Sequence, residues 1–441
     1  MDLSTQGRRQ CNINNPLFEL PYQPQRVFTM PLRWDSFSDQ PKMIRDKTYK
    51  QRIYKSVVWD FFKMLGTNLV ILPLSVLFYL LIPAQKKPIK TSLFFGLSIN
   101  LDKNPDETRQ LVDDLAVDSL LIRLPLHSIE NLSDYFEFAQ QYKDKQLLIN
   151  ILQDRRHIED PLLAQHSLDA IFKIFTPLTT HFQIGNAINR KKWAIFSMDE
   201  YLRFYKIAYD LKQKKYPKLT LLGSSVIDFE YYFTIRTLFN FYRLRFDQLS
   251  SLLYVDRRGA PENTQAGLDL LEKLQLLHAI ARLSPKTSTK IVITETNWPI
   301  KNTYPYAPTS ANECVNLEDH ANYLVRYYIL ALASGVVNNV YWHQLIAPGY
   351  GLIDNRDHLV KYPAYYAFKT LLSLLKQTRF IELKQDKGLY HAHFQGKTKV
   401  DVYWALQKTR LKTRGKKIIL CNGKEVRQND VLVGESPLYI L

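Results

Sequence analysis

Two stretches decide the fold of this chain: Phe182-Gln-Ile-Gly-Asn-Ala-Ile-Asn-Arg190 and Ile293-Thr-Glu-Thr-Asn-Trp-Pro299. Each begins with an apolar run typical of a buried strand and then changes to polar residues. Asn186 lies in the polar part of the first stretch, and Glu295 lies in the polar part of the second. Polar side chains that directly follow buried parallel strands collect at one mouth of a barrel. The two stretches therefore predict a shared site.

The chain from Thr91 onward alternates short apolar runs with longer helical stretches. Eight such runs favour a (β/α)8 barrel (TIM barrel), an α/β fold with parallel strands and crossover helices. A final helix over Ala364–Leu375 should close the barrel. The predicted strands are Leu93–Ile99, Ser119–Leu124, Gln146–Leu152, His181–Gly185, Lys218–Ser224, Leu249–Val255, Lys290–Thr294 and Val336–Trp342. The predicted helices include Asp106–Leu115, Asp199–Lys214, Thr264–Leu283 and Asn316–Ser334.

Segments on both sides of the barrel complete the domain organisation. Residues 1–60 have a basic, turn-rich composition and are predicted to be a mostly irregular tail. The barrel itself is expected over residues 91–375. Residues 380–441 contain short alternating runs such as Lys417-Ile-Ile-Leu420, which predict a small C-terminal β domain.

A membrane helix is predicted over residues 61–84. Within it, Met64–Pro83 contains 20 residues without a charge, which matches the apolar thickness of a bilayer. The alternative is a buried helix or hairpin packed on the barrel, because Asn68 and Pro73 interrupt the apolar run. Lys and Arg residues near the two ends are almost equal in number, and the longer basic tail favours a cytoplasmic N-terminus with the barrel outside.

The formal net charge of +17 favours anionic partners, namely nucleic acid, acidic glycans or lipid headgroups, unless it reflects a solvated basic surface. The sequence has no zinc-finger spacing, no Gly-rich phosphate loop and no basic module interleaved with aromatic residues. Its histidines are dispersed. We therefore expect no nucleic-acid partner, no metal and no cofactor.

The two opening stretches resemble the catalytic strand ends of clan A, the retaining (β/α)8 glycoside hydrolases that include cellulases, β-xylosidases and iduronidases. Such enzymes use two carboxyl groups about 5–5.5 Å apart. By this resemblance, Glu295 is the nucleophile, although a structural salt bridge is the alternative role. Ala187 stands where the clan signature Ile-x-Asn-Glu-Pro-Asn has the general acid. A methyl group transfers no proton, so a contribution of roughly 10² to 10⁴-fold is missing.

The resemblance also assigns roles to residues around Glu295. Asn186 would contact the sugar 2-hydroxyl group, and Arg123 would hold the nucleophile ionised and oriented. Trp298 would be an aromatic sugar platform. Trp342 would either form the floor of the sugar subsite or pack in the core. Further candidate sugar-binding residues at the predicted barrel mouth are Asn189, Arg190, Asp154, Arg257, Gln344 and Tyr350.

A replacement for the missing acid could come from a neighbouring strand end, and Glu230, Asp256 and Glu262 are the candidates. Arg257, followed by a second arginine, suggests an anionic ligand such as a uronic acid, a phosphate-bearing sugar or a sulfate.

Three functions fit these observations. The first is a membrane-anchored glycoside hydrolase or transglycosylase that acts on an envelope or surface polysaccharide, with Glu295 as its nucleophile. The second is a catalytically inactive barrel that binds a glycan and assists polysaccharide assembly or export. The third is a structural membrane protein whose basic tail recruits a partner. Glu295 with Arg123 and Asn186 favours the first function over the third, and Ala187 favours the second over the first. We expect a glycoside-hydrolase-like protein, because a candidate nucleophile with its arginine indicates a site that handles sugars.

Overall fold

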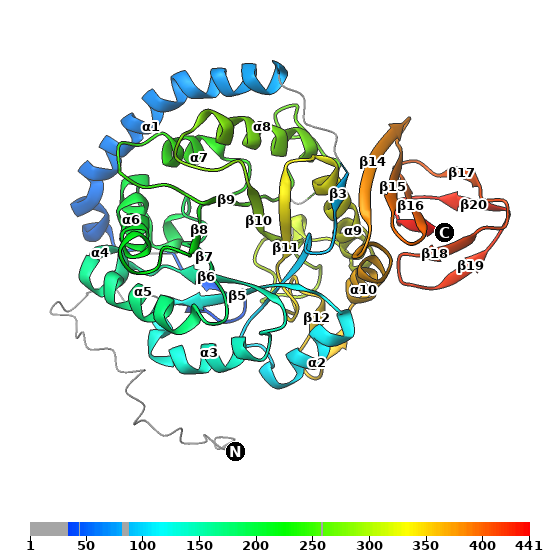
Figure 1. Cartoon of the computed structure of the whole chain (residues 1–441), viewed down its shortest axis with the longest axis horizontal. Helices are drawn as coiled ribbons and strands as arrows, with labels where there is room; N and C mark the ends of the chain where they lie inside the picture. The colour runs from blue at the N-terminus through cyan, green and yellow to red at the C-terminus, as the bar shows by residue number, and fades with distance from the viewer. Residues whose placement is uncertain (1–33, 44, 82–87, 257–258) are drawn as a thin grey trace.

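Eight parallel strands close into a barrel in the order β10-β11-β4-β5-β6-β7-β8-β9, as the computed structural model shows (Figure 1). The predicted (β/α)8 fold is confirmed. The structure describes residues 34–43, 45–81, 88–256 and 259–441, so most of the predicted N-terminal tail and the candidate Arg257 lie outside the described residues. The barrel strands are β4 (Phe95–Ile99), β5 (Ser119–Pro125), β6 (Gln146–Leu152), β7 (His181–Ile184), β8 (Thr220–Ile227), β9 (Gln248–Leu252), β10 (Ile291–Thr296) and β11 (Val337–Trp342).

Alternate side chains of each strand face the barrel interior and the surrounding helices. On β5, Leu120 and Ile122 belong to the large core beneath the helices, whereas Leu121 belongs to a separate cluster with Tyr341 inside the barrel. A Cβ atom added at Gly96 on β4 would lie 2.5 Å from the ring of Tyr341, so glycine is required there for the strands to close around this ring.

The helices around the barrel start at capping residues that the sequence carries at the right positions. Asp160, Ser197 and Asn316 each accept a backbone N–H in the first turn of the helix that follows them. Asp269 and Glu272 form a reciprocal capping box. The helices are α2 (Pro105–Leu115), α3 (Leu132–Gln140), α4 (Arg155–Glu159), α5 (Pro161–Phe175), α6 (Met198–Lys215), α7 (Tyr231–Leu238), α8 (Leu270–Leu283), α9 (Leu317–Ala333) and α10 (Pro363–Leu375).

The C-terminal residues form the predicted β appendage, which lies beside α9 and α10 (Figure 1). It is a seven-stranded sheet in the order β19-β18-β21-β16-β15-β14-β3, accompanied by the pair β17-β20. Its edge strand β3 (Ile89–Lys90) comes from the chain just before the barrel. The other strands are β14 (Arg379–Asp386), β15 (Leu389–Gln395), β16 (Lys399–Ala405), β17 (Thr409–Lys412), β18 (Lys417–Leu420), β19 (Glu425–Arg427), β20 (Asp430–Val433) and β21 (Leu438–Ile440). Near the barrel mouth lies the short pair β12 (Ile353–Asp354) and β13 (Val360–Lys361).

The segment before the barrel is more ordered than its composition predicts. A short hairpin, β1 (Trp34–Asp35) and β2 (Gln40–Pro41), is followed by the 35-residue helix α1 (Lys47–Leu81). The helix begins well before the predicted residue 61. Its charged first half is held by the barrel, because Asp60 forms a buried ion pair of 2.8 Å with Arg236 and Lys63 pairs with Asp199.

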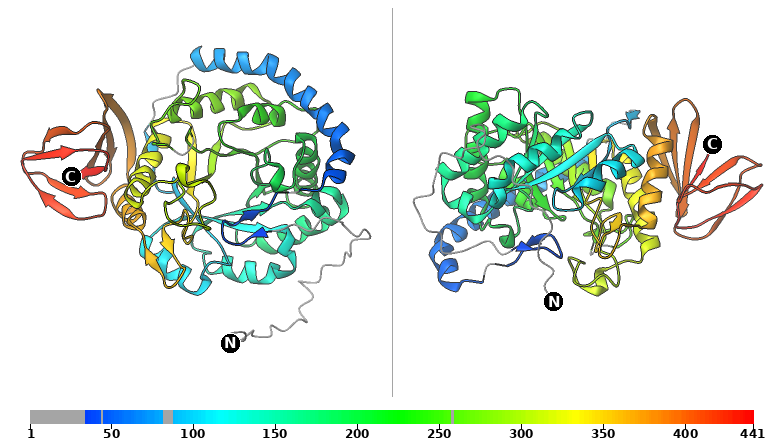
Figure 2. Two further views of the ribbon diagram at one scale, coloured as in Figure 1. Left: turned by 180° about the vertical axis from the view of Figure 1, so that it is seen from behind. Right: turned by 90° about the horizontal axis from the view of Figure 1, so that it is seen from below.

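Helix α1 lies along the outside of the barrel, against α7 and α8 (Figures 1 and 2). It is long and apolar enough to cross a membrane, and little of its apolar stretch is buried. The large apolar side chains that α1 exposes to solvent are Tyr54, Trp59, Phe61, Phe62, Leu65, Leu69, Val70, Leu72, Leu74, Val76, Leu77, Leu80 and Leu81.

A buried ion pair joins the barrel to the C-terminal sheet. Glu262 accepts hydrogen bonds of 2.8 Å from Arg326 Nε on α9 and from Trp404 Nε1 on β16. The side chains of both Glu262 and Arg326 are buried. We expect Glu262→Gln to lower the free energy of unfolding by about 3–5 kcal/mol, because the change leaves a buried guanidinium without its main counter-charge.

Denaturant unfolding of the two proteins measures this difference. Glu425→Gln is the matched control, because Glu425 pairs with Lys417 on the surface and an exposed pair contributes about 0–1 kcal/mol. Equal losses in both variants would contradict the structural role of Glu262.

Candidate functional site

Glu295 lies at the end of β10, where its half-buried carboxylate lines a pocket at the barrel mouth. The hydroxyl of Tyr254 donates a hydrogen bond of 2.7 Å to Oε1, and Nδ2 of Asn186 lies 3.4 Å from Oε2. Burial acts to raise the pKa of Glu295, but His343, Arg123 and these two donors together lower it below its ordinary value. Burial also lowers the pKa of His343 to about 4, so at neutral pH Arg123 supplies the permanent positive charge.

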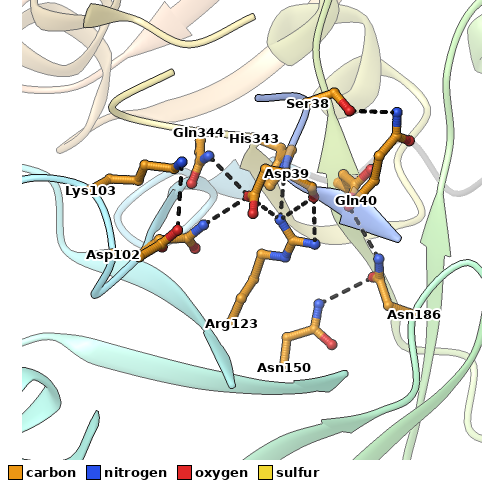
Figure 3. Close-up of polar contacts among 12 residues, drawn as sticks. Ser38, Asp39, Gln40, Asp102, Lys103, Arg123, Asn150, Asn186, His343 and Gln344 are labelled. Carbon is orange, nitrogen blue, oxygen red and sulfur yellow. Dashed lines mark hydrogen bonds and ion pairs between the residues drawn. The ribbon is translucent and has the colours of Figure 1, made fainter. Parts of the chain in front are cut away.

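Arg123, near the end of β5, makes its ion pair with a different carboxylate from the one expected. Its Nη1 atom lies 2.6 Å from Oδ2 of Asp39, in the turn of the β1–β2 hairpin (Figure 3). Both side chains are about 95% buried, with 4% and 5% exposed. The guanidinium also lies near the rings of Trp34 and Trp193, at 5.9 and 5.6 Å. Arg123 therefore acts on Glu295 through its charge, while Tyr254 and Asn186 contact that carboxylate directly.

Ala187 occupies an apolar position. It is fully buried in a cluster with Leu152, Trp193, Leu252 and Tyr254, and Trp34 of the hairpin packs against this cluster. Its φ angle is +45°, in the left-handed region that non-glycine residues rarely adopt. Its methyl group neither donates nor accepts a proton, and the rings of Trp193 and Tyr254 belong to the same cluster.

A polar network holds the loop after β7. Gln153 binds the backbone N–H and C=O of Asn186, both at 2.8 Å, and Nδ2 of Asn150 donates to Oδ1 of Asn186 at 3.1 Å. Asn189 contacts the backbone of Ile227 and Oε2 of Glu230, so it positions the loop after β8. This network fixes the orientation in which Asn186 meets Glu295.

None of the three replacement acids predicted from sequence lines the described pocket. Glu230 accepts hydrogen bonds from Asn189 and Arg190, and Glu262 lies in the buried contact with the C-terminal sheet. Asp256 follows β9 outside the pocket lining. Among the described residues, the carboxylates that line the pocket are Asp39, Asp228 and Glu295, and Asp228 pairs with Arg190 at 2.5 Å.

The remaining candidates divide between the pocket and the core. Trp298 and Trp342 stack on each other at 5.8 Å, are almost fully buried and do not line the pocket, so both are core aromatics here. Tyr350 lines the pocket and accepts a hydrogen bond of 3.3 Å from Gln344. Asp154 caps α4 and bonds the ring of His157 rather than facing the pocket. Pocket residues that were not among the candidates predicted from sequence are Ser38, Asp39, Gln40, Lys192, Trp193, Ile227, Asp228, Tyr254, Asn297, Pro308 and His343.

Comparison with known proteins gives matches in structure alone. The sequence matches no family model and no curated protein. A family 39 glycoside hydrolase from the gut symbiont Bacteroides cellulosilyticus aligns with a TM-score of 0.63 and 16% identity, over 80% of this chain and 81% of that one. A family 30 endoxylanase from Clostridium papyrosolvens aligns with a TM-score of 0.57 and 10% identity, over 81% and 97% of the two chains. The barrel has the fold of the clan A glycoside hydrolases.

A third match supports this resemblance. A family 39 β-xylosidase from Caulobacter crescentus aligns with a TM-score of 0.54 and 10% identity, over 81% of this chain and 97% of that one. Identities of 10–16% show a shared fold and leave the chemistry to be argued from the site.

The hydrogen bond from Tyr254 to Glu295 can be tested by its pH dependence. Because the pKa of folded Glu295 lies below its ordinary value, the ionised carboxylate contributes stability at neutral pH, and this contribution is lost as pH falls through the folded pKa. We expect Tyr254→Phe to destabilise the protein at pH 7 by about 1.5–3 kcal/mol, because a charged acceptor loses its donor. The loss should shrink as the pH falls through the folded pKa of Glu295, which lies below its ordinary value.

Urea unfolding at a series of pH values measures this loss. Tyr327→Phe is the matched control, because the buried hydroxyl of Tyr327 donates to the neutral carbonyl of Leu253 at 2.6 Å. The loss caused by the control substitution should not vary with pH. A loss for Tyr254→Phe that is equally constant would contradict the assigned hydrogen bond.

Proposed function

We propose that this protein binds a carbohydrate at the barrel mouth and presents Glu295 to it as a candidate nucleophile. The observation that carries the proposal is the state of this carboxylate, which lines a pocket at a barrel strand end, is contacted by two donors and has a pKa below its ordinary value. A nucleophile in retaining glycoside hydrolysis must be both ionised and oriented. The clan A fold supports the same assignment.

The pocket supports transfer to or from activated sugars better than hydrolysis of ordinary glycosides. Ala187 supplies no proton, and the carboxylates of Asp39 and Asp228 are both paired with arginines. A sugar whose leaving group departs without protonation does not need the missing acid. The polysaccharide of an envelope or cell surface is the proposed natural ligand, and an inactive barrel that assists glycan assembly or export is the alternative.

Labelling with 2-fluoro glycosyl fluorides tests the proposal, because their fluoride leaving group departs without a general acid. We expect intact-mass measurement on the full-length chain to show a covalent adduct with one member of a panel of neutral and uronic sugars. Glu295→Gln should abolish the adduct. Glu230→Gln is the matched control and should retain it, since Glu230 is a carboxylate near the same barrel mouth that lies outside the pocket. A folded protein that binds glycans and forms no adduct would favour the inactive barrel.

We further propose that α1 attaches the protein to a membrane. Asp60 and Lys63 of α1 pair with residues of the barrel, whereas large apolar side chains are exposed from Tyr54 to Leu81. If α1 keeps these contacts, the barrel flank itself lies against the lipid, and a helix that crosses the bilayer must first leave α7 and α8. The cytoplasmic N-terminus expected from the basic tail stays a prediction.

Liposome flotation of the full-length chain tests this attachment. Leu69 and Leu77 are 76% and 52% exposed on α1, so Leu69→Asp with Leu77→Asp should leave the fold unchanged. Each aspartate adds about 2.5–3.5 kcal/mol to insertion near the centre of an apolar span, and we expect the protein to remain with the soluble fraction. Leu432→Asp is the control, since Leu432 is 57% exposed on the C-terminal β appendage and this variant should float as the unchanged protein does. Flotation of the double variant would contradict the assignment of α1.

A further inference from the structure

The carboxylate of Asp39 is bound inside the barrel mouth by donors from three parts of the barrel. Its Oδ2 atom lies 2.6 Å from Arg123 Nη1 and 3.4 Å from Gln344 Nε2 (Figure 3). The same oxygen lies 3.0 Å from Asn100 Nδ2. Arg123 belongs to β5, Asn100 follows β4, and Gln344 follows β11. The exposed fractions of these three donor residues are 4%, 6% and 0%. One carboxylate oxygen thus meets three buried donors, one of which is charged.

These donors form a site that remains when Asp39 is removed. All three belong to the barrel, and a buried guanidinium requires an anionic partner whatever its source. The same residues carry further buried polar atoms without a hydrogen-bond partner, namely Arg123 Nε, Asn100 Oδ1 and Gln344 Oε1. Amide oxygens of this kind are ready acceptors for hydroxyl groups. The site therefore offers more binding capacity than the side chain of Asp39 uses.

Asp39 also occupies a place between two pockets. Asp39 and Arg123 line the pocket that contains Glu295, and they line a second pocket together with Trp34, Asn100 and Tyr135. Withdrawal of the Asp39 side chain would connect these two spaces beside the candidate nucleophile.

The segment that carries Asp39 is not part of the barrel. Asp39 lies in the turn of the β1–β2 hairpin and has a left-handed φ of +52°, which is strained for aspartate. Apart from Asp39, the described contacts of the hairpin with the barrel are made by three side chains. Trp34 packs on Trp193, His127 and the guanidinium of Arg123, Phe37 packs on Tyr306, and Gln40 accepts a hydrogen bond from Lys192. A ligand that offers Arg123 a better anionic partner can displace such a segment.

We propose that Arg123, Asn100 and Gln344 form a subsite for the carboxylate of an anionic sugar, and that Asp39 occupies this subsite in the resting protein. The inference rests on the proposed carbohydrate function and specifies its ligand class as uronic-acid oligosaccharides. The ligand carboxylate replaces the Asp39 carboxylate as the partner of Arg123. The sugar hydroxyl groups donate hydrogen bonds to the amide oxygens of Asn100 and Gln344. Hairpin displacement then lowers the apparent affinity of the unchanged protein for uronates.

Isothermal titration of the full-length chain with galacturonic and glucuronic acid oligosaccharides, and with their neutral counterparts, tests the proposal. We expect Asp39→Asn to tighten uronate binding by roughly tenfold or more, because the competing charge is gone, and to leave neutral sugars within about twofold. Asp386→Asn makes the same change in net charge on the exposed face of β14 and should change neither affinity. Adding Arg123→Gln to Asp39→Asn should remove the gain.

Three outcomes would overturn the inference: an unchanged uronate affinity in Asp39→Asn, an equal gain for neutral sugars, or an equal gain for acetate. Failure of the proposed function looks different, because then no glycan binds to any variant. If Asp39→Asn does not fold, hydrogen exchange of the unchanged protein gives the answer. Uronates should then accelerate exchange in residues 34–41 while neutral sugars do not, and protection that uronates leave unchanged would overturn the displacement.

Discussion

A permanently charged guanidinium buried at the barrel mouth is the constraint on which the site depends. Arg123 is 4% exposed and keeps its charge at every physiological pH, so an anion must lie beside it. Asp39 is that anion in this structure. Since Arg123 is engaged by Asp39, Glu295 is oriented instead by Tyr254 and Asn186, and it feels the arginine through space. The barrel mouth is therefore complete only with the segment that precedes the barrel.

The segment that precedes the barrel contains both the β1–β2 hairpin and α1 in one continuous piece of chain. The β1–β2 hairpin supplies Asp39 to the mouth, and α1 begins at Lys47, a few residues after the hairpin ends. The buried pair of Asp60 with Arg236 fixes the first half of α1 against the barrel, which limits how far the hairpin can move. Displacement of Asp39 therefore requires the short link between β2 and α1 to rearrange and the packing of Trp34 on Trp193 and His127 to break. Conversely, a helix that left α7 and α8 to cross a bilayer would pull on the same link and on the hairpin.

The fold could be predicted from sequence because its signal repeats. Eight apolar runs separated by amphipathic helices specify a barrel, and strand ends such as Glu295 and Asn186 then converge without knowledge of any side-chain contact. Asp39 could not be predicted, because it lies 84 residues from Arg123 in a segment without periodicity. Trp298 and Trp342 show a second limit. Position after a strand places a residue near the mouth, but packing decides whether its ring faces the pocket or, as here, the core.

The small side chain at position 187 and the presence of the hairpin are connected through packing. Ala187 is fully buried beside Trp193 and Tyr254, and Trp34 of the hairpin packs against the same cluster. A glutamate at position 187 would have to place a longer, charged side chain among these rings, which requires either displacement of the hairpin or burial of an unpaired carboxylate. The small residue at 187 thus allows Trp34 to pack against this cluster, and the packed hairpin places Asp39 beside Arg123. The alanine at position 187 therefore leaves room for Trp34 and for the hairpin that supplies the anionic partner of Arg123.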